Sequence, residues 1–341
     1  MKTAGGAPRW AVLLVVLFSL TVGAEGVCRW MLGLGTPPLY ETDPAYEYRL
    51  KPDQKIQRFG NTIMVNRFGM RSDDFPSRKQ QPDELRVMVF GDSIVNGGSE
   101  VDHAGLATSL LQSDLRRSIK HPVMVGNVSA GSWGPGNWLA YAQRFGFFDA
   151  DVVVLVLGSG DARDNPDFAP LSVNHPTEPP VLALQEAVQR YLPRHLPEPL
   201  AGWLRGPTSA SATPAAAKQA SDPTLQGLQD LERFLRLAHD GKRAVVVLHH
   251  PSRNETDTAQ MEPGFEDAAA AVRGLGLPWI ELRPTYTSAA DGLYRDSVHL
   301  SAQGQRVLGD ALHRLVLPLL ARLSAGQSNA VARCIGEVQA S

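Results

Sequence analysis

From residue 85 onward, the pattern of apolar and polar positions alternates between strand-like and helix-like segments. Short, nearly continuous runs of Val, Ile and Leu predict buried strands, because a strand covered on both faces lacks the alternation of a half-exposed one. Segments with apolar residues three and four positions apart predict amphipathic helices between these runs. The predicted strands are residues 85–90, 122–127, 151–157, 243–249 and 278–282. The predicted helices are residues 105–119, 136–147, 180–191, 224–239, 263–275 and 302–323.

Strands that alternate with helices predict an α/β fold with a parallel sheet and helices on both of its faces. We expect this domain to occupy residues 85–324. The preceding residues 35–84 have alternating apolar positions and a break at Gly60, which predict an extended lead-in with a small β-hairpin. Residues 206–224 are rich in Ala, Ser and Pro, which predicts a flexible insertion, and residues 325–341 form a weakly patterned tail.

The N-terminal residues 1–34 contain an uncharged apolar run, residues 10–24, which Lys2 and Arg9 precede. This run is shorter than the roughly 20 residues that a spanning helix prefers. Glu25 and Arg29 interrupt the apolar positions that follow, and these positions are expected to extend a helix into the membrane interface. We therefore favour an uncleaved signal anchor, with a cleaved signal peptide as the alternative. Positive charge before the run predicts that the N-terminus stays in the cytoplasm and that the remainder is exported.

Composition narrows the class of protein. The chain has 341 residues, of which 43% are hydrophobic and 20% charged, which is typical of a globular protein. The formal net charge of −2 gives no support to nucleic acid as a partner. Cys28 and Cys334 are the two cysteines, and their spacing suggests neither a disulfide framework nor a zinc site, so we expect no metal and no cofactor.

Ligands of an open parallel sheet bind outside the carboxyl ends of its strands, so the residues that follow each strand are candidates for chemistry. Asp92 and Ser93 follow the first strand in a glycine-bounded turn. A serine hydroxyl becomes a nucleophile when a base takes its proton and a third group orients that base. Asp296 and His299 stand three positions apart before the last helix, a spacing that lets the carboxylate reach Nδ1 and leaves Nε2 for Ser93. The alternative is a simple turn, followed by a loop with Ser301 as a helix cap.

Three stretches carry a resemblance to a known family: "FGDSIVNGG", "NVSAGSWGPGN" and "RDSVHLSAQG". In this order they resemble the blocks of the SGNH/GDSL hydrolase superfamily, over residues 85–323, and "VNRFGMRSDDF" resembles the lead-in of exported bacterial members. The resemblance implies a flavodoxin-like three-layer sandwich, with a five-stranded parallel sheet of order 2-1-3-4-5. It also implies hydrolysis or transfer of an O-acyl group, with Ser93 as nucleophile, His299 as general acid and base, and Asp296 as the orienting group.

The third block departs from the family pattern. The usual Gly-x-Asn-Asp is here "GSGD", residues 158–161, so Gly160 occupies the position of the Asn that donates to the oxyanion. The backbone N–H of Ser93 remains a donor, and the other candidates for oxyanion or substrate binding are Gly131, Ser132, Ser159 and Gly160. Asn127, Asn137 and Asn165 are further candidates for replacing the absent side chain. The alternative is a slow or specialised enzyme, because one lost oxyanion donor costs about 10²–10³ in turnover.

These expectations describe an exported serine esterase that removes an O-acyl group, in particular O-acetyl, from an acylated small molecule or a cell-envelope or extracellular polysaccharide. We expect it in the bacterial inner membrane, with the catalytic domain in the periplasm or outside the cell. The alternatives are an O-acetyltransferase acting on an exported polysaccharide and a degenerate hydrolase kept as a carbohydrate-binding scaffold. Trp133 and Trp138 are expected to stack on a sugar or to pack against the sheet. His249 and His250 point opposite ways from a strand, and we expect core histidines rather than metal ligands there.

Overall fold

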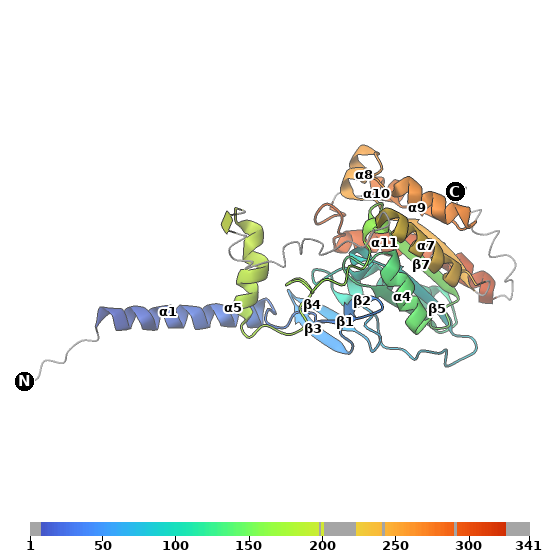
Figure 1. Cartoon of the computed structure of the whole chain (residues 1–341). Coiled ribbons are helices and arrows are strands. Elements are labelled where there is room, and N and C mark those ends of the chain that lie inside the picture. Colours follow the sequence, from blue (N-terminus) through green and yellow to red (C-terminus); the bar gives the residue numbers. More distant parts are fainter. Residues whose placement is uncertain (1–7, 198, 201–222, 241–242, 290–291, 325–341) are drawn as a thin grey trace, which may run out of the picture.

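The computed structural model describes most of the chain (Figure 1). The described residues are 8–197, 199–200, 223–240, 243–289 and 292–324. The predicted tail 325–341 and all but the last two residues of the predicted insertion 206–224 lie outside them.

A five-stranded parallel sheet forms the centre of the molecule. Its strands are β5 (Leu85–Gly91), β6 (Val123–Ser129), β7 (Val152–Leu157), β8 (Ala244–His249) and β9 (Trp279–Glu281). The order across the sheet is β6-β5-β7-β8-β9, and every neighbouring pair is parallel. Numbered along the chain this is the order 2-1-3-4-5, so the predicted flavodoxin-like fold class is confirmed. All residues of β5, β7 and β8 are buried, as their unbroken apolar runs predict.

Helices cover both faces of the sheet, and the side chains of alternate strand residues pack into two hydrophobic cores, one on each face. The helices α3 (Ala107–Ser118) and α11 (Ala302–Ser324) pack on the face that includes Val87 and Val89. The helices α4 (Pro135–Phe145), α7 (Pro223–Ala238) and α9 (Phe265–Gly274) pack on the face that includes Met88 and Phe90. The short elements at the strand ends and crossovers are α2 (Ser93–Asn96), η2 (His103–Gly105), η3 (Asp161–Arg163), α8 (Arg253–Thr258) and α10 (Arg283–Thr287).

The lead-in contains two β-hairpins rather than the single one predicted. The pair β3 (Gln54–Arg58) and β4 (Asn61–Val65) turns at Gly60, where the prediction placed it. The pair β1 (Tyr40–Asp43) and β2 (Glu47–Leu50) was missed, because both strands have only four residues and β1 carries no alternation of apolar positions. The lead-in belongs to the main core, since Tyr46, Tyr48, Met70 and Phe75 pack with the α4 side of the sheet.

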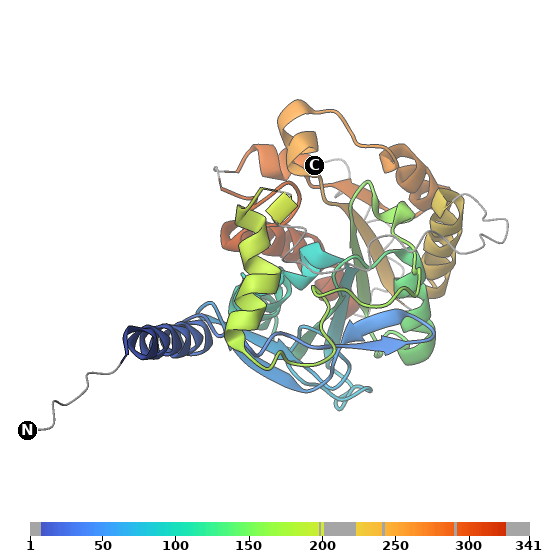
Figure 2. The same cartoon turned by 60° about the vertical axis from the view of Figure 1, so that its left-hand side comes forward.

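The N-terminal helix α1 (Arg9–Gly26) continues into the π-helical turn η1 (Val27–Met31) and projects from the body (Figures 1 and 2). Residues 9–31 form the one helix in the described part of the chain that is long and apolar enough to cross a membrane. The helical segment predicted at residues 180–191 is built from α5 (Ala183–Glu186) and η4 (Ala187–Tyr191), and η5 (Leu192–His195) follows it. This segment lies between α1 and the body in both views.

Candidate active site

Ser93 stands at the carboxyl end of β5, where the chain turns sharply into α2. The carboxylate of Asp92 accepts a hydrogen bond from the N–H of Ile94 at 2.8 Å and so caps this short helix. A Cβ at Gly91 would lie 2.4 Å from Cγ2 of Val95, so the tight turn requires glycine. The N–H of Ser93 is the first of the helix and has no acceptor among the described residues, which leaves it free for a ligand.

His299 and Asp296 lie on the loop between α10 and α11. The loop folds back on itself, because Tyr294 and Leu300 form an isolated bridge and the N–H of Arg295 donates to the carbonyl of His299 at 3.0 Å. Its far end leads directly into α11, where Ser301 accepts from the N–H of Gly304 at 3.2 Å as the predicted cap.

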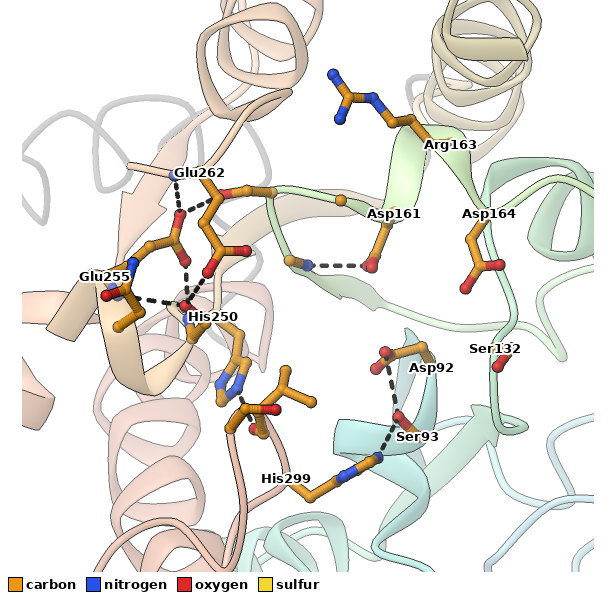
Figure 3. A pocket seen from close by; sticks show the side chains of 17 residues that line it. Asp92, Ser93, Ser132, Asp161, Arg163, Asp164, His250, Glu255, Glu262 and His299 are labelled. Carbon is orange, nitrogen blue, oxygen red and sulfur yellow. Dashed lines mark hydrogen bonds between the residues drawn. The ribbon is translucent and has the colours of Figure 1, made fainter. Parts of the chain in front are cut away.

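The structure brings Ser93, His299 and Asp296 into one hydrogen-bonded line. Figure 3 shows the part of it that joins His299 to Ser93. Nε2 of His299 lies 3.0 Å from Oγ of Ser93, and Nδ1 lies 2.8 Å from Oδ2 of Asp296. A carboxylate only accepts hydrogen bonds, so Nδ1 carries the proton and Nε2 is free to accept the proton of the serine. Ser93 and His299 are 206 positions apart in the chain, and the two distances are those that general-base activation of a hydroxyl requires.

The carboxyl groups around this line differ in acidity. Burial by itself would raise the pKa of Asp296, but the N–H groups of His299 and Val298 and the imidazole of His299 outweigh it and hold the pKa below the ordinary value. Burial raises the pKa of Asp92 to about 6. Burial, and next the charge of Asp92, raises the pKa of Asp161 well above its ordinary value. Asp296 is therefore ionised at neutral pH, which suits a group that stabilises an imidazolium.

A pocket of about 580 Å³ opens beside Ser93. Most of the side chains that line it are polar: of the described residues that line it, Val298 is the one with an apolar side chain. The lining residues are Asp92, Ser93, Ser132, Gly158, Ser159, Gly160, Asp161, Arg163, Asp164, His250, Ser252, Asn254, Glu255, Glu262, Ser297, Val298 and His299. The described residues contain no group of three or more His, Cys, Asp or Glu side chains that could hold a metal ion.

His250 supports the loop that carries the imidazole. Its Nε2 lies 3.0 Å from the carbonyl oxygen of Val298, the residue before His299, and its Nδ1 lies 3.1 Å from the hydroxyl of Tyr286. A carbonyl only accepts, so Nε2 is protonated and Nδ1 accepts from the tyrosine. Burial lowers the pKa of His250 to about 4, so the ring is neutral and this tautomer persists at neutral pH.

A second buried network holds the loop after β7. The hydroxyl of Ser159 donates to the carboxylate of Glu255 and lies 2.9 Å from Nε2 of His249. Because the Ser159 hydroxyl is bound there, its contribution to a ligand is limited to the backbone. His249 and His250 are thus both core histidines, with different partners on the two sides of β8.

The predicted oxyanion candidates divide into two groups. Ser132, Ser159 and Gly160 line the pocket together with Ser93, whereas Gly131 does not and its carbonyl accepts from the hydroxyl of Tyr48 at 2.6 Å. The asparagines considered as replacements lie outside the wall. Nδ2 of Asn127 donates to the carbonyl of Val95 at 2.8 Å, Nδ2 of Asn137 donates to the carbonyl of Tyr46 at 3.1 Å, and Asn165 does not line the pocket.

Two glycines of the second block serve the protein rather than a ligand. A Cβ at Gly134 would lie 1.8 Å from the carbonyl oxygen of Asp164, and one at Gly136 would lie 2.7 Å from Pro166. These close approaches seat the loop after β7 on the start of α4. The neighbouring Trp133 and Trp138 are fully buried, so they pack in the core and do not stack on a sugar.

The residues after β8 are the part of the wall that the sequence analysis missed. His250, Ser252, Asn254 and Glu255 all line the pocket. The signal was available, since β8 is parallel to the other strands and its carboxyl end meets the same edge of the sheet. The sequence predicted core histidines at 249 and 250, but the support that His250 gives to the His299 loop depends on partners such as Tyr286 that no local pattern identifies.

No protein-family model matches the sequence, and no curated protein matches it. The structure is similar to solved structures of lipolytic enzymes. A lipase/acylhydrolase from Enterococcus faecalis is 16% identical with a TM-score of 0.41, and the match covers 69% of this chain and 96% of that one. A member of the lipolytic protein G-D-S-L family from Veillonella parvula is 12% identical with a TM-score of 0.40, covering 67% and 97%. A two-domain esterase active on acetylated mannans is 11% identical with a TM-score of 0.43, covering 70% of this chain and 50% of that one.

Proposed function

We propose that this chain is a serine esterase of the SGNH/GDSL type that hydrolyses O-acyl esters. The observation that carries the proposal is the line of hydrogen bonds from Asp296 through His299 to Ser93, which ends at a pocket lined mostly by polar side chains. The order of the sequence blocks along the 2-1-3-4-5 sheet supports the same assignment.

In this mechanism Oγ of Ser93 attacks the acyl carbon while Nε2 of His299 takes the hydroxyl proton. The N–H of Ser93 stabilises the negative oxygen of the tetrahedral intermediate. His299 then returns its proton to the departing alcohol oxygen, which leaves the acyl group on Ser93. A water molecule, deprotonated by His299, then attacks the acyl-enzyme to form a second tetrahedral intermediate. When this intermediate collapses, His299 returns the proton to Oγ of Ser93 and the acid is released. Asp296 stabilises the imidazolium in both steps.

The pocket wall favours a short acyl group on a hydroxyl-rich alcohol. A long acyl chain gains about 0.8 kcal/mol for each buried CH₂, and a wall with one apolar side chain supplies little of this. Hydroxyl, amide and carboxylate groups instead offer hydrogen bonds to a polyol. We therefore propose an acetyl ester of a carbohydrate in the cell envelope or outside the cell as the substrate class.

The surface of the N-terminal helix supports the proposal that the chain is anchored in a membrane. The apolar side chains of α1 from Trp10 to Val22 are mostly exposed on the helix surface, as in a helix that faces lipid. We propose that α1 is retained as a single anchor in a bacterial inner membrane, with the catalytic domain on the exported side.

Labelling with a fluorophosphonate tests the nucleophile in the detergent-solubilised full chain. We expect one covalent adduct by intact mass, which Ser93→Ala removes and the matched pocket variant Ser297→Ala retains. Turnover of 4-nitrophenyl acetate should exceed that of the octanoate ester, and acetylated oligosaccharides should release acetate. Equal labelling of the wild type and Ser93→Ala, or the absence of any adduct in the folded wild type, would overturn the esterase proposal.

A further inference from the structure

The end of the N-terminal helix is bound to a segment about 150 residues further along the chain. The carboxylate of Glu25 accepts from the N–H groups of Ala183 at 3.0 Å and Leu184 at 2.8 Å, at the start of α5. The guanidinium of Arg29 bonds the same carboxylate at 2.8 Å and donates to the carbonyl of Val181 at 3.3 Å. These contacts fix the start of α5 beside the last turns of α1.

Buried contacts make this junction continuous with the body. Cys28, Leu34 and Ala183 form a small core of their own. The N–H of Gly35 donates to the carboxylate of Glu186 at 2.7 Å, and the same carboxylate pairs with a guanidinium of the β3–β4 hairpin. The helix α1 is therefore attached through several buried partners rather than through a free linker.

Several apolar side chains are exposed around this junction, and we call four of them the apolar collar: Trp30, Met31, Val181 and Leu182. Trp30 and Val181 are each 85% exposed, Met31 is 73% exposed and Leu182 is 48% exposed. They come from two segments far apart in the sequence, which the contacts of Glu25 and Arg29 hold together. In Figures 1 and 2 the segment that begins at α5 runs across the end of α1, on the side of the body from which α1 projects.

The position of the apolar collar along the axis of α1 indicates that the collar meets the membrane. Glu25 precedes Trp30 by five residues, or roughly 7 Å of helix at about 1.5 Å per residue. Its carboxylate binds the start of α5, and Arg29, the residue before Trp30, binds the carbonyl of Val181. When α1 spans a bilayer of about 30 Å, Trp30 falls near the interface where Trp side chains concentrate, and Leu182 falls at the same level or deeper.

We propose that the apolar collar inserts into the interfacial layer of the bilayer that α1 crosses, and so docks the catalytic domain on the membrane in one orientation. This inference rests on the proposed retention of α1 as an anchor and is independent of the esterase activity. Exposed apolar side chains beside a guanidinium suit the boundary between acyl chains and phosphate groups. Through Val181 and Leu182 the collar adds to the anchor a second membrane contact from a segment about 150 residues away in the chain.

Spin labels at three leucines of similar exposure test the inference in the full chain, reconstituted in phosphatidylethanolamine/phosphatidylglycerol vesicles. Cys28→Ala and Cys334→Ala remove the native thiols, and Leu17→Cys, Leu182→Cys and Leu237→Cys then carry one nitroxide each. Leu17 lies on α1, and Leu237 is a matched exposed leucine on α7, away from α1 (Figure 1). Power saturation with oxygen, which partitions into lipid, and with a water-soluble nickel chelate reports the surroundings of each label.

We expect the ratio of oxygen to nickel accessibility at 182 to exceed that at 237 by roughly threefold or more, as for a group in the membrane interface. A water-like ratio at 182 with a lipid-like ratio at 17 overturns the collar and leaves the anchor. A water-like ratio at 17 overturns both. A label at 182 that neither reagent reaches indicates burial against protein, such as a second copy, and also overturns the inference. Val181→Cys serves as the second variant if Leu182→Cys does not fold, and esterase activity of each sample is assayed separately.

Discussion

Replacing Gly160 with asparagine restores the side chain that the third block lacks, and the structure allows the change. Gly160 has φ of −84° and ψ of −15°, which any residue adopts. A Cβ at this position meets no heavy atom within 4 Å, and the residue lines the pocket beside Ser93. An asparagine there fits without displacing backbone, and its amide N–H₂ is available to the oxyanion.

The size of the effect follows from two opposing terms. An oxyanion donor is worth about 10²–10³ in turnover, or about 2.7–4 kcal/mol, when its surroundings hold it in place. Nothing packs against the new Cβ, so ordering the side chain costs about 1 kcal/mol. We therefore expect Gly160→Asn to raise kcat on 4-nitrophenyl acetate by about 20- to 200-fold, with KM nearly unchanged, because the interaction forms mainly in the transition state.

Gly160→Ala is the matched control, since it adds the Cβ without the donor and should leave kcat within about twofold of wild type. Initial rates of both variants are measured in detergent, with Ser93→Ala as the background. If Gly160→Asn is folded by circular dichroism and no faster than Gly160→Ala, residue 160 does not face the oxyanion. The assignment of "GSGD" to the third block would then be wrong.

Three further predictions test the site and its supports. Asp296→Asn should lower kcat by about 10⁴, because the amide no longer selects the imidazole tautomer, and a loss below tenfold in steady-state rates would contradict its orienting role. Glu186→Gln leaves the buried guanidinium of Arg58 without its counter-charge and should lower the free energy of unfolding in urea by about 3–5 kcal/mol. Asp74→Asn, at an exposed ion pair, should lower it by less than about 1 kcal/mol. Equal losses of stability in the two variants would refute this contrast. The folded-state pKa of Asp92, about 6, lies above its unfolded value, so the wild type should lose up to about 3 kcal/mol relative to Asp92→Asn as the pH rises from about 4 to 7. Parallel urea curves at all pH values would show that burial does not perturb this carboxyl.

The sequence predicted those features that depend on local pattern and on the geometry of a parallel sheet. The sheet order is confirmed, and each strand lies close to its predicted range, because unbroken Val, Ile and Leu runs have few other places in an α/β fold. The structure brings Ser93 and His299 together at the edge where parallel strands end. By contrast, the support that His250 gives to the His299 loop depends on a tyrosine hydroxyl and a backbone carbonyl far along the chain. The binding of Glu25 to the start of α5 could not be predicted from the sequence either, since neither segment carries a motif.

The helix that presents Ser93 has only four residues, and a helix of one turn has no stability of its own. Distant side chains supply what the turn lacks. From the lead-in, the buried guanidinium of Arg71 donates to the carbonyl of Asn96 at 3.0 Å, at the end of the helix. From α11, Nε2 of Gln305 donates to the carbonyl of Ile94 within the helix at 2.8 Å. From α4, the indole of Trp138 donates to the carbonyl of Gly91, which precedes the helix, at 3.0 Å. Because these three side chains come from the lead-in, from α4 and from the last helix, the position of the proposed nucleophile depends on the complete fold, and the lead-in is part of the catalytic unit rather than a spacer before it.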